Sequence, residues 1–221
     1  MRILIVAGAL LAAACLTLSA GAAVRANSQT YPDSTGEDPA AADITGVVVS
    51  NDDNGVITFQ TNISNRPALT GDMGVSVFID TDQNATDGAG PDFDGAEIEL
   101  ALDSTGVDLG KWNGTGFGFT GSPSSLVASY ANGAIIKVKA ADVGLTTFNF
   151  FAATITGTNP DFHFDFAPDP GHGTFNYQVK ITPPAATPPA TPPKAKPAPK
   201  KKPPLCKKGQ KSTKKKPCRK K

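Results

Sequence analysis

The sequence predicts an all-β protein that folds as a single antiparallel β-sandwich. Between Asp43 and Ile181 the apolar residues come in short alternating runs rich in Val, Ile, Thr and Phe. Gly, Asn and Asp interrupt these runs at the spacing of about eight to twelve residues that is typical of sandwiches and barrels. Helical periodicity is absent, and Ala140–Leu145 is expected to form one helical turn at most. A body of about 140 residues is long enough to bury one core.

The individual strands follow from the period of two, which sends alternate side chains to opposite faces. In Met73–Asp80 we expect Val75, Val77 and Ile79 to face the core. The Ile and Leu residues of Ala96–Asp103 are expected to do the same, with its Glu residues on the opposite face. The candidate strands are Ile44–Ser50, Val56–Asn62, Met73–Asp80, Ala96–Asp103, Val107–Trp112, Gly116–Phe119, Leu126–Tyr130, Ala134–Lys139, Phe148–Thr156 and Thr174–Ile181.

Two dipeptides predict hairpin turns between neighbouring strands. Asn54-Gly55 separates the first two candidate strands, and Asn132-Gly133 precedes the run Ala134–Lys139. Asn-Gly is the preferred pair for a type I′ turn, because both central positions of that turn need a positive φ.

The N-terminus is expected to be an export signal, residues 1–26, followed by a flexible segment, residues 27–42. Met1-Arg2 supplies a positive charge and Ile3–Leu18 is almost wholly apolar, with cleavage expected after Ala26 or around Ala20–Ala23. An uncleaved membrane anchor is the alternative, although the apolar run is short for a membrane span. We therefore expect a secreted or surface-associated protein with no transmembrane segment after cleavage.

Charge is sorted by sign along the chain, although the net charge is only +1. Residues 27–181 hold all 20 acidic residues and five basic ones, a balance of −15, whereas residues 182–221 hold 14 Lys or Arg and no acid. Residues 182–204, rich in Pro, Ala and Lys, are expected to form an extended linker without a core. Residues 205–221 are expected to be a disordered basic tail that attaches to an anionic surface, such as acidic wall polymer or lipid headgroups. A merely solubilising tail is the alternative.

Nucleic acid is not an expected partner, because the basic run lacks the interleaved aromatic residues that stack on bases.

The number and positions of the cysteines are consistent with export. Signal cleavage removes Cys15 and leaves Cys206 and Cys218, an even pair that is expected to form a disulfide outside the cell. The body contains no Cys, so its stability must come from an ordinary core.

The densest polar segment is the loop between the candidate strands that end at Asp80 and begin at Ala96. Carboxylate and amide oxygens at i, i+2 and i+4 are the hard ligands that Ca²⁺ requires. Ala85 and Pro91 occupy positions where an EF-hand needs Gly and Glu, so an EF-hand is excluded while a calcium-stapled loop remains. The alternative is that these residues only form turns. The candidate metal ligands are Asp80, Asp82, Asn84, Asp87, Asp92 and Asp94.

Four features suggest a family: the opening Asp43-Ile44 strand, the approach Arg66–Asp72, the IDTD motif at Ile79–Asp82, and the Trp112-Asn113-Gly114 turn. Together they make residues 43–119 resemble exported bacterial β-sandwich proteins related to family 9 carbohydrate-binding modules and DOMON-like domains. The resemblance implies a jelly-roll-like sandwich, a metal near the IDTD loop, and a sugar held between aromatic rings. The candidate ligand-binding residues are Trp112, Asn113 and Phe117.

Enzymatic function is disfavoured by the sequence. Glu97 and Glu99 share one strand face without an obvious substrate cleft, and no G-x-S-x-G motif is present. His163 and His172 with a carboxylate are a weaker alternative for a transition-metal site. The sequence therefore predicts a secreted, non-catalytic binding module that is stabilised by calcium and binds carbohydrate or cell-wall glycan. A structural or adhesive surface protein without a small ligand is the alternative.

Overall fold

The computed structural model describes residues 27–182 and, near the C-terminus, residues 201, 203–209, 211, 213–215 and 218–219. The chain divides into two compact units, Met1–Pro183 and Pro184–Lys221. The predicted export signal and most of the predicted linker lie outside the described residues. Within the described part of the chain, no helix is long and apolar enough to cross a membrane.

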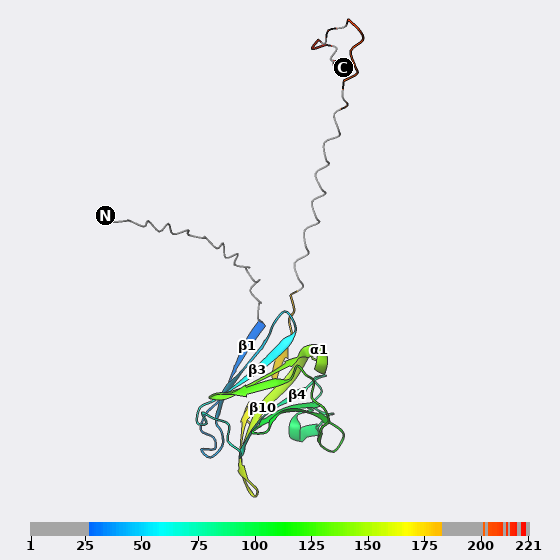
Figure 1. Ribbon diagram of the computed structural model, residues 1–221. Helices are drawn as coiled ribbons and strands as arrows, with labels where there is room; N and C mark the ends of the chain where they lie inside the picture. The colour runs from blue at the N-terminus through cyan, green and yellow to red at the C-terminus, as the bar shows by residue number, and fades with distance from the viewer. Residues whose placement is uncertain are drawn as a thin grey trace, which may run out of the picture. The chain divides into compact units, whose positions relative to one another are not determined.

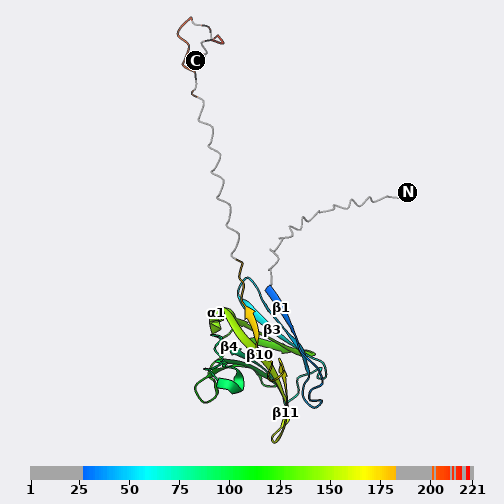
Figure 2. The same cartoon turned by 180° about the vertical axis from the view of Figure 1, so that it is seen from behind.

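The first unit is a β-sandwich of two antiparallel sheets (Figures 1 and 2), which confirms the predicted fold class. The five-stranded sheet has the strand order β1-β2-β3-β9-β8, and the seven-stranded sheet has the order β11-β10-β4-β5-β6-β7, with β12 also paired to β10. The first sheet comprises β1 (Asn27–Pro32), β2 (Ile44–Asn51), β3 (Val56–Ile63), β9 (Gly133–Lys139) and β8 (Val127–Tyr130). The second comprises β11 (Asp161–Ala167), β10 (Thr147–Thr158), β4 (Met73–Asp80), β5 (Ile98–Asp103), β6 (Gly106–Trp112), β7 (Phe117–Phe119) and β12 (Phe175–Gln178).

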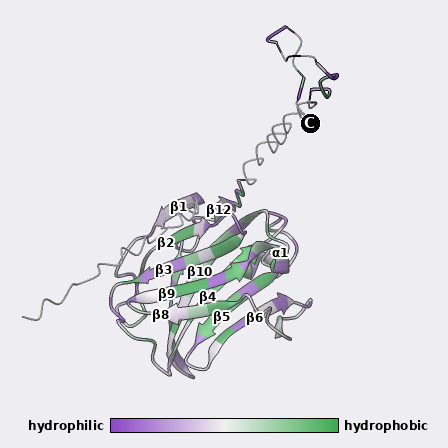
Figure 3. Ribbon diagram, turned by 45° about the horizontal axis from the view of Figure 1, so that its top comes forward, coloured by the Kyte–Doolittle hydropathy of each residue, from purple (hydrophilic) through white to green (hydrophobic). Residues whose placement is uncertain are grey.

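The core lies between the two sheets and is built from the alternate residues of each strand that face inward. Val75, Val77 and Ile79 of β4 are fully buried, as predicted. From the opposite sheet, the ring of Phe59 packs against that of Phe150, with a centroid distance of 5.8 Å. Figure 3 shows hydrophobic residues along β2, β9 and β10. Full burial of one such side chain contributes about 1.5–3 kcal/mol, so this core can stabilise the body without a disulfide.

The structure differs from the sequence-based expectation at residues 27–42, which we expected to be flexible. Asn27–Pro32 forms β1 and pairs with β2 in a continuous antiparallel register. Only Tyr31 of this strand is buried, with its ring 5.1 Å from that of Phe150 and 4.7 Å from that of Phe175. A polar edge strand with a single apolar anchor shows no alternation in the sequence. The sandwich therefore begins at Asn27 rather than Asp43.

Two further differences concern β11 and one of the predicted turns. β11 is absent from the candidate strands because its large Phe residues face outward, and its buried positions are Asp165, which is 4% exposed, and the small Ala167. Both predicted hairpins form. Asn132 and Gly133 have positive φ, as a type I′ turn requires, whereas at the first hairpin only Gly55 does. There the Gly55 N–H donates to the Asp52 carbonyl at 3.0 Å, which closes a wider loop. The expected helical turn is α1 (Ala140–Val143).

The second unit contains a disulfide between Cys206 and Cys218, whose Cα atoms lie 4.9 Å apart. The backbone on either side of the disulfide is also hydrogen-bonded: the Cys206 N–H donates to the Arg219 carbonyl, and the Arg219 N–H donates to the Pro204 carbonyl, both at 3.0 Å. The cross-link therefore closes a small loop inside the basic tail. It does not join the tail to the sandwich.

Candidate functional site

Aromatic rings gather on the outer face of the seven-stranded sheet, where an antiparallel sheet is usually polar. Phe78 of β4 and Phe151 of β10 are register partners, and their rings stack at a centroid distance of 4.8 Å. Phe93, in the 3₁₀ helix Gly90–Phe93, covers Phe78 at 5.0 Å, and Phe117 of β7 lies 5.5 Å from Phe78. Trp112 extends the group, 5.4 Å from Phe117. We call these five residues the outer aromatic cluster.

The structure brings two of the three predicted ligand-binding residues together. Trp112 and Phe117 are register partners on β6 and β7. Trp112 is half-buried and lines a hollow of about 390 Å³, whereas Phe117 packs into the outer aromatic cluster. The Asn113 Oδ1 accepts hydrogen bonds from the Thr115 and Gly116 backbone N–H groups at 3.0 and 3.2 Å. Asn113 therefore shapes the turn after β6, and Trp112 is the residue that reaches the hollow. The other residues that line this hollow are Thr81, Glu97, Ile98, Lys111, Val143 and Gly144.

Three carboxylates converge beside that hollow and form the first group that could hold a cation. Asp80, Asp82 and Glu97 each offer an oxygen within 4.8 Å of the others. Asp80 is 2% exposed, and burial raises the pKa of its carboxyl, although hydrogen bonds from Asn149 and from the Asn84 N–H favour its charged form. We call Asp80, Asp82 and Glu97 the loop carboxylates.

Glu97 was not among the predicted ligands, yet its position has a simple cause. Its N–H donates to the Ile79 carbonyl at 3.0 Å, which places it beside the end of β4. Its Oε2 accepts hydrogen bonds from the Thr81 N–H at 2.7 Å and the Thr81 hydroxyl at 2.9 Å. The strand period puts Glu97 on the outer face, on the same side as Asp80. Continuing the alternation of β4 to Asp80, and that of β5 back to Glu97, places both residues on the outer face. This continuation could have identified Glu97 as a ligand from the sequence.

The remaining predicted metal ligands do not belong to the loop carboxylates. The Asn84 Nδ2 donates to the Asp87 Oδ2 at 2.8 Å, and the Asn84 Oδ1 accepts from the Thr86 hydroxyl at 2.7 Å, so these side chains hold the loop itself. Asp92 and Asp94 line a different hollow, of about 270 Å³. The loop is tightly closed at Gly95, which has φ +80° and whose added Cβ would lie 2.4 Å from the Asn84 carbonyl oxygen. Only Gly permits this approach.

A second group of carboxylates lies near the C-terminal end of β11, and the sequence did not indicate that Glu37 joins it. Glu37, Asp165 and Asp169 each offer an oxygen within 4.8 Å of the others. Asp33 lies nearby, and within the described residues its buried Oδ2 has no hydrogen-bond partner. Burial, together with the charges of Asp169, Asp165 and Glu37, raises the pKa of Asp33 to about 7. Asp165 is held by the Ile44 N–H, which donates to its Oδ2 at 2.6 Å.

His163 and Glu99 have hydrogen-bonding partners, and His172 lies at a hollow. The His163 Nδ1 lies 2.8 Å from the Asp38 Oδ2, and His172 lines a hollow together with Asp33 and Asp169. Neither histidine belongs to the two carboxylate groups. The Glu99 Oε1 accepts a hydrogen bond from the Ser76 hydroxyl at 2.8 Å, and burial raises the pKa of Glu99.

No family model matches the chain, and neither a curated protein nor a solved structure matches it. The resemblance to family 9 carbohydrate-binding modules and DOMON-like domains therefore stays a prediction.

Proposed function

We propose that this protein is a secreted, non-catalytic binding module of the type its sequence resembles, with a glycan ligand that rests on Trp112 beside a bound calcium ion. The observation that supports it is the contact between two features. Glu97 belongs to the loop carboxylates and also lines the hollow of Trp112. A cation there would fix Glu97 and Thr81, and would thereby hold one wall of the hollow in place.

The chemistry of the hollow suits a sugar. The indole of Trp112 offers a flat apolar face for the C–H groups of a sugar ring, and its N–H offers a polar handle. Lys111 and Glu97 supply a donor and an acceptor for hydroxyl groups at the edge of that ring. The combination of an aromatic platform with a few polar groups favours an uncharged or mixed-polarity ligand over a wholly apolar one.

The loop carboxylates fit calcium better than a transition metal. All three side chains offer oxygen, and hard oxygen ligands suit Ca²⁺, whereas zinc and copper sites use imidazole or thiolate. Asp80 is buried and gains most from a positive partner, because burial disfavours its charged form. Calcium would supply that charge and hold the ends of β4 and β5 together. The basic tail would keep the module at an anionic envelope through charge alone.

The test is glycan-array binding by the full-length protein and its Trp112→Ala variant. Loss of a bound glycan in the variant is the expected result. Phe119→Ala is the matched control, because Phe119 is 50% exposed on the neighbouring strand and lies outside the hollow. Binding that survives Trp112→Ala, or that is lost equally in Phe119→Ala, contradicts the proposed surface. If the full-length protein binds no glycan, the structural or adhesive alternative replaces this proposal.

A further inference from the structure

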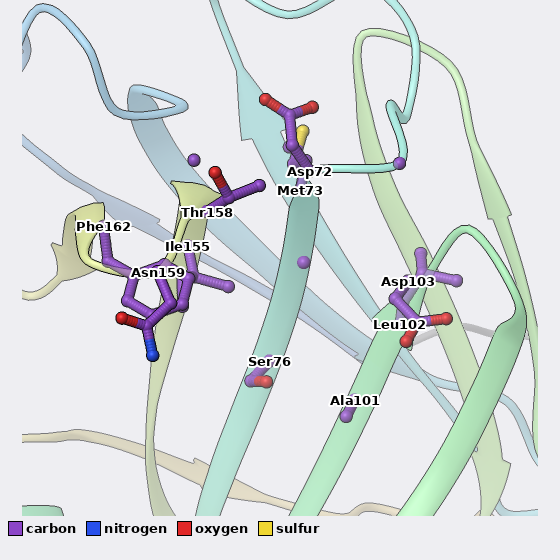
Figure 4. A pocket seen from close by; sticks show the side chains of 13 residues that line it. Asp72, Met73, Ser76, Ala101, Leu102, Asp103, Ile155, Thr158, Asn159 and Phe162 are labelled. Atoms are coloured by element: carbon purple, nitrogen blue, oxygen red, sulfur yellow. The ribbon is translucent and has the colours of Figure 1, made fainter.

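Another hollow lies on the outer face of the seven-stranded sheet, away from Trp112. Its volume is about 460 Å³, within the range of about 300–1,000 Å³ of small-ligand sites. Figure 4 shows its walls: Ile155, Thr158 and Asn159 stand on the side of β10 and the following turn, with Phe162 of β11 beside them, and Asp103 stands on the side of β5. We call this space the β4 hollow, because β4 runs along its floor.

The floor is low because several outward-facing residues are small. Ser76 and Ala101 are register partners on β4 and β5, and Gly74 precedes Ser76 by two residues on the same face. On β10, Gly157 carries no side chain opposite Phe162 of β11. Small residues in the centre of a sheet face, with larger ones on both sides, leave a trough. The β4 hollow is therefore a consequence of the strand register.

One wall of the trough is aromatic. Phe162 is 43% exposed, and its ring centroid lies 6.3 Å from that of Phe164, which is 47% exposed. Single exposed apolar side chains are common on protein surfaces, whereas two neighbouring exposed Phe rings form an apolar patch. Phe162 lines the hollow, and the Phe164 ring, inclined by 53° to that of Phe162, extends the apolar surface beyond it.

The other wall is negatively charged. Asp72 and Asp103 are exposed at the rim, and none of the residues that line the hollow is Lys, Arg or His. The Thr105 N–H and hydroxyl donate to the Asp103 Oδ1 at 2.7 and 2.6 Å, which fixes this carboxylate and lowers its pKa. A hydrogen bond from Thr70 lowers the pKa of Asp72. Arg66 approaches Asp72 but donates to the Ala40 carbonyl at 2.8 Å.

We propose that the β4 hollow is a second glycan subsite, which takes a sugar residue carrying a protonated amino group. The apolar face of that sugar lies against Phe162, and its ammonium group lies between Asp72 and Asp103. Ser76, Thr158 and Asn159 supply donors and acceptors for its hydroxyl groups. This inference rests on the proposed function only in taking a glycan as the ligand class.

Charge complementarity selects the amino sugar over neutral and acidic ones. A ligand that lies between two ionised carboxylates displaces water from them, and its own interactions must offset that cost in free energy. A neutral sugar offers only hydrogen bonds from its hydroxyl groups, whereas an ammonium group offers charge-assisted hydrogen bonds. An acidic sugar is repelled, and the −15 balance of residues 27–181 strengthens that repulsion. A cation beside Phe162 also gains from the negative face of the ring.

The experiment compares two oligosaccharides of equal length, one of glucosamine and one of N-acetylglucosamine, by calorimetric titration of the full-length protein. A mildly acidic buffer keeps the amines protonated and the Asp carboxylates ionised, since the ordinary pKa of Asp is about 3.9. We expect the glucosamine oligomer to bind about tenfold more tightly, because its ammonium groups can form ion pairs that the acetylated oligomer cannot form. The double variant Asp72→Asn, Asp103→Asn is expected to abolish this preference, so that both oligomers bind with similar affinity.

A charge-matched control is the double variant Asp108→Asn, Asp161→Asn, since both residues are exposed on the same sheet outside the hollow lining. This control is expected to keep the preference. Equal loss of the preference in both double variants would show a general charge effect and would overturn the proposal. Tighter binding of a lysine oligomer than of a glucosamine oligomer of equal charge would also overturn it, in favour of a peptide ligand.

The outcomes separate this proposal from the proposed function. If the acetylated oligomer binds through Trp112 but the amino preference is missing, the proposed function stands and the subsite is overturned. If the preference depends on Asp72 and Asp103 while Trp112→Ala has no effect, the subsite stands and the Trp112 surface is overturned. A protein that binds neither oligomer overturns the subsite, whereas the proposed function is then decided by the glycan array.

Discussion

The substitution Asp33→Asn is expected to stabilise the sandwich at neutral pH in the absence of a bound cation. Asp33 has a buried Oδ2 without a partner among the described residues, and it faces the charges of Asp169, Asp165 and Glu37. An amide at this position removes one negative charge and replaces an orphan acceptor with a donor. That donor can then pair with the neighbouring carboxylates, so the change acts on repulsion and on hydrogen bonding in the same direction.

The size of the effect follows from the pKa of Asp33, which is raised from 3.8 to about 7. A folded-state pKa above the unfolded value means that the folded protein binds the proton more tightly. The stability from this proton is fully present below about pH 4 and is lost as the pH rises to about 7. At about 1.36 kcal/mol per pH unit the ceiling is about 4 kcal/mol, and solvent screening of a partly exposed group reduces it to about 2 kcal/mol.

The assay is a thermal melt of wild type and Asp33→Asn at about pH 4 and about pH 8, with a chelator to remove divalent cations. For a body of this size, about 2 kcal/mol corresponds to about 4–8 °C in Tm at the higher pH. The two proteins are expected to melt together at the lower pH. Asp161→Asn, an exposed carboxylate on β11, controls for the loss of one charge. An equal gain at both pH values, or a lower Tm for Asp33→Asn at about pH 8, would refute the reasoning.

Three further predictions concern the cation, the loop and the tail. Calcium at about 100 times its Kd is expected to add about 2.7 kcal/mol to the free energy of unfolding, measured by a thermal melt. Asp82→Ala is expected to reduce this gain. Equal melting midpoints with calcium and with chelator contradict the calcium prediction. Gly95→Ala is expected to destabilise the sandwich by more than about 2 kcal/mol in a urea melt, because its Cβ would meet the backbone. Gly90→Ala is the control: it has open space around it and is expected to cost about 1 kcal/mol for its positive φ. Equal losses would show that the backbone contact at Gly95 is unimportant. Reduction of the Cys206–Cys218 disulfide is expected to leave the melting of the sandwich unchanged, because the disulfide lies in the other unit, and a fall of several degrees would be the contrary result.

The features that sequence patterns predicted correctly depend on residues that are close together in the sequence. The alternation in β4 correctly placed Val75, Val77 and Ile79 in the core, because a strand buried on one face repeats every two residues. The proximity of Asp80 and Asp82 is likewise local. Tyr31 anchors a polar edge strand whose pairing depends on β2, so nothing in its own segment indicates a strand.

The features that were missed depend on which strands become neighbours. Asp33 and Asp165 meet only because β11 lies beside the start of β2 in the opposite sheet, a contact between segments more than a hundred residues apart. The β4 hollow also arises from register, since the small size of Ser76 and Ala101 matters only once they are opposite each other. No local pattern carries that information. The charge composition also predicts the basic tail, whose anionic partner stays a prediction.

The most direct test of the proposed function uses Trp112, the single Trp of the chain, as a reporter. Its fluorescence is measured during titration of the full-length protein with glycans that bind in the array, in calcium and in chelator. If a sugar rests on the indole, the emission is expected to shift along a saturable curve, with tighter binding in calcium because Glu97 is shared by the hollow and the loop carboxylates. A glycan that binds the protein without changing this emission would contradict the proposed surface.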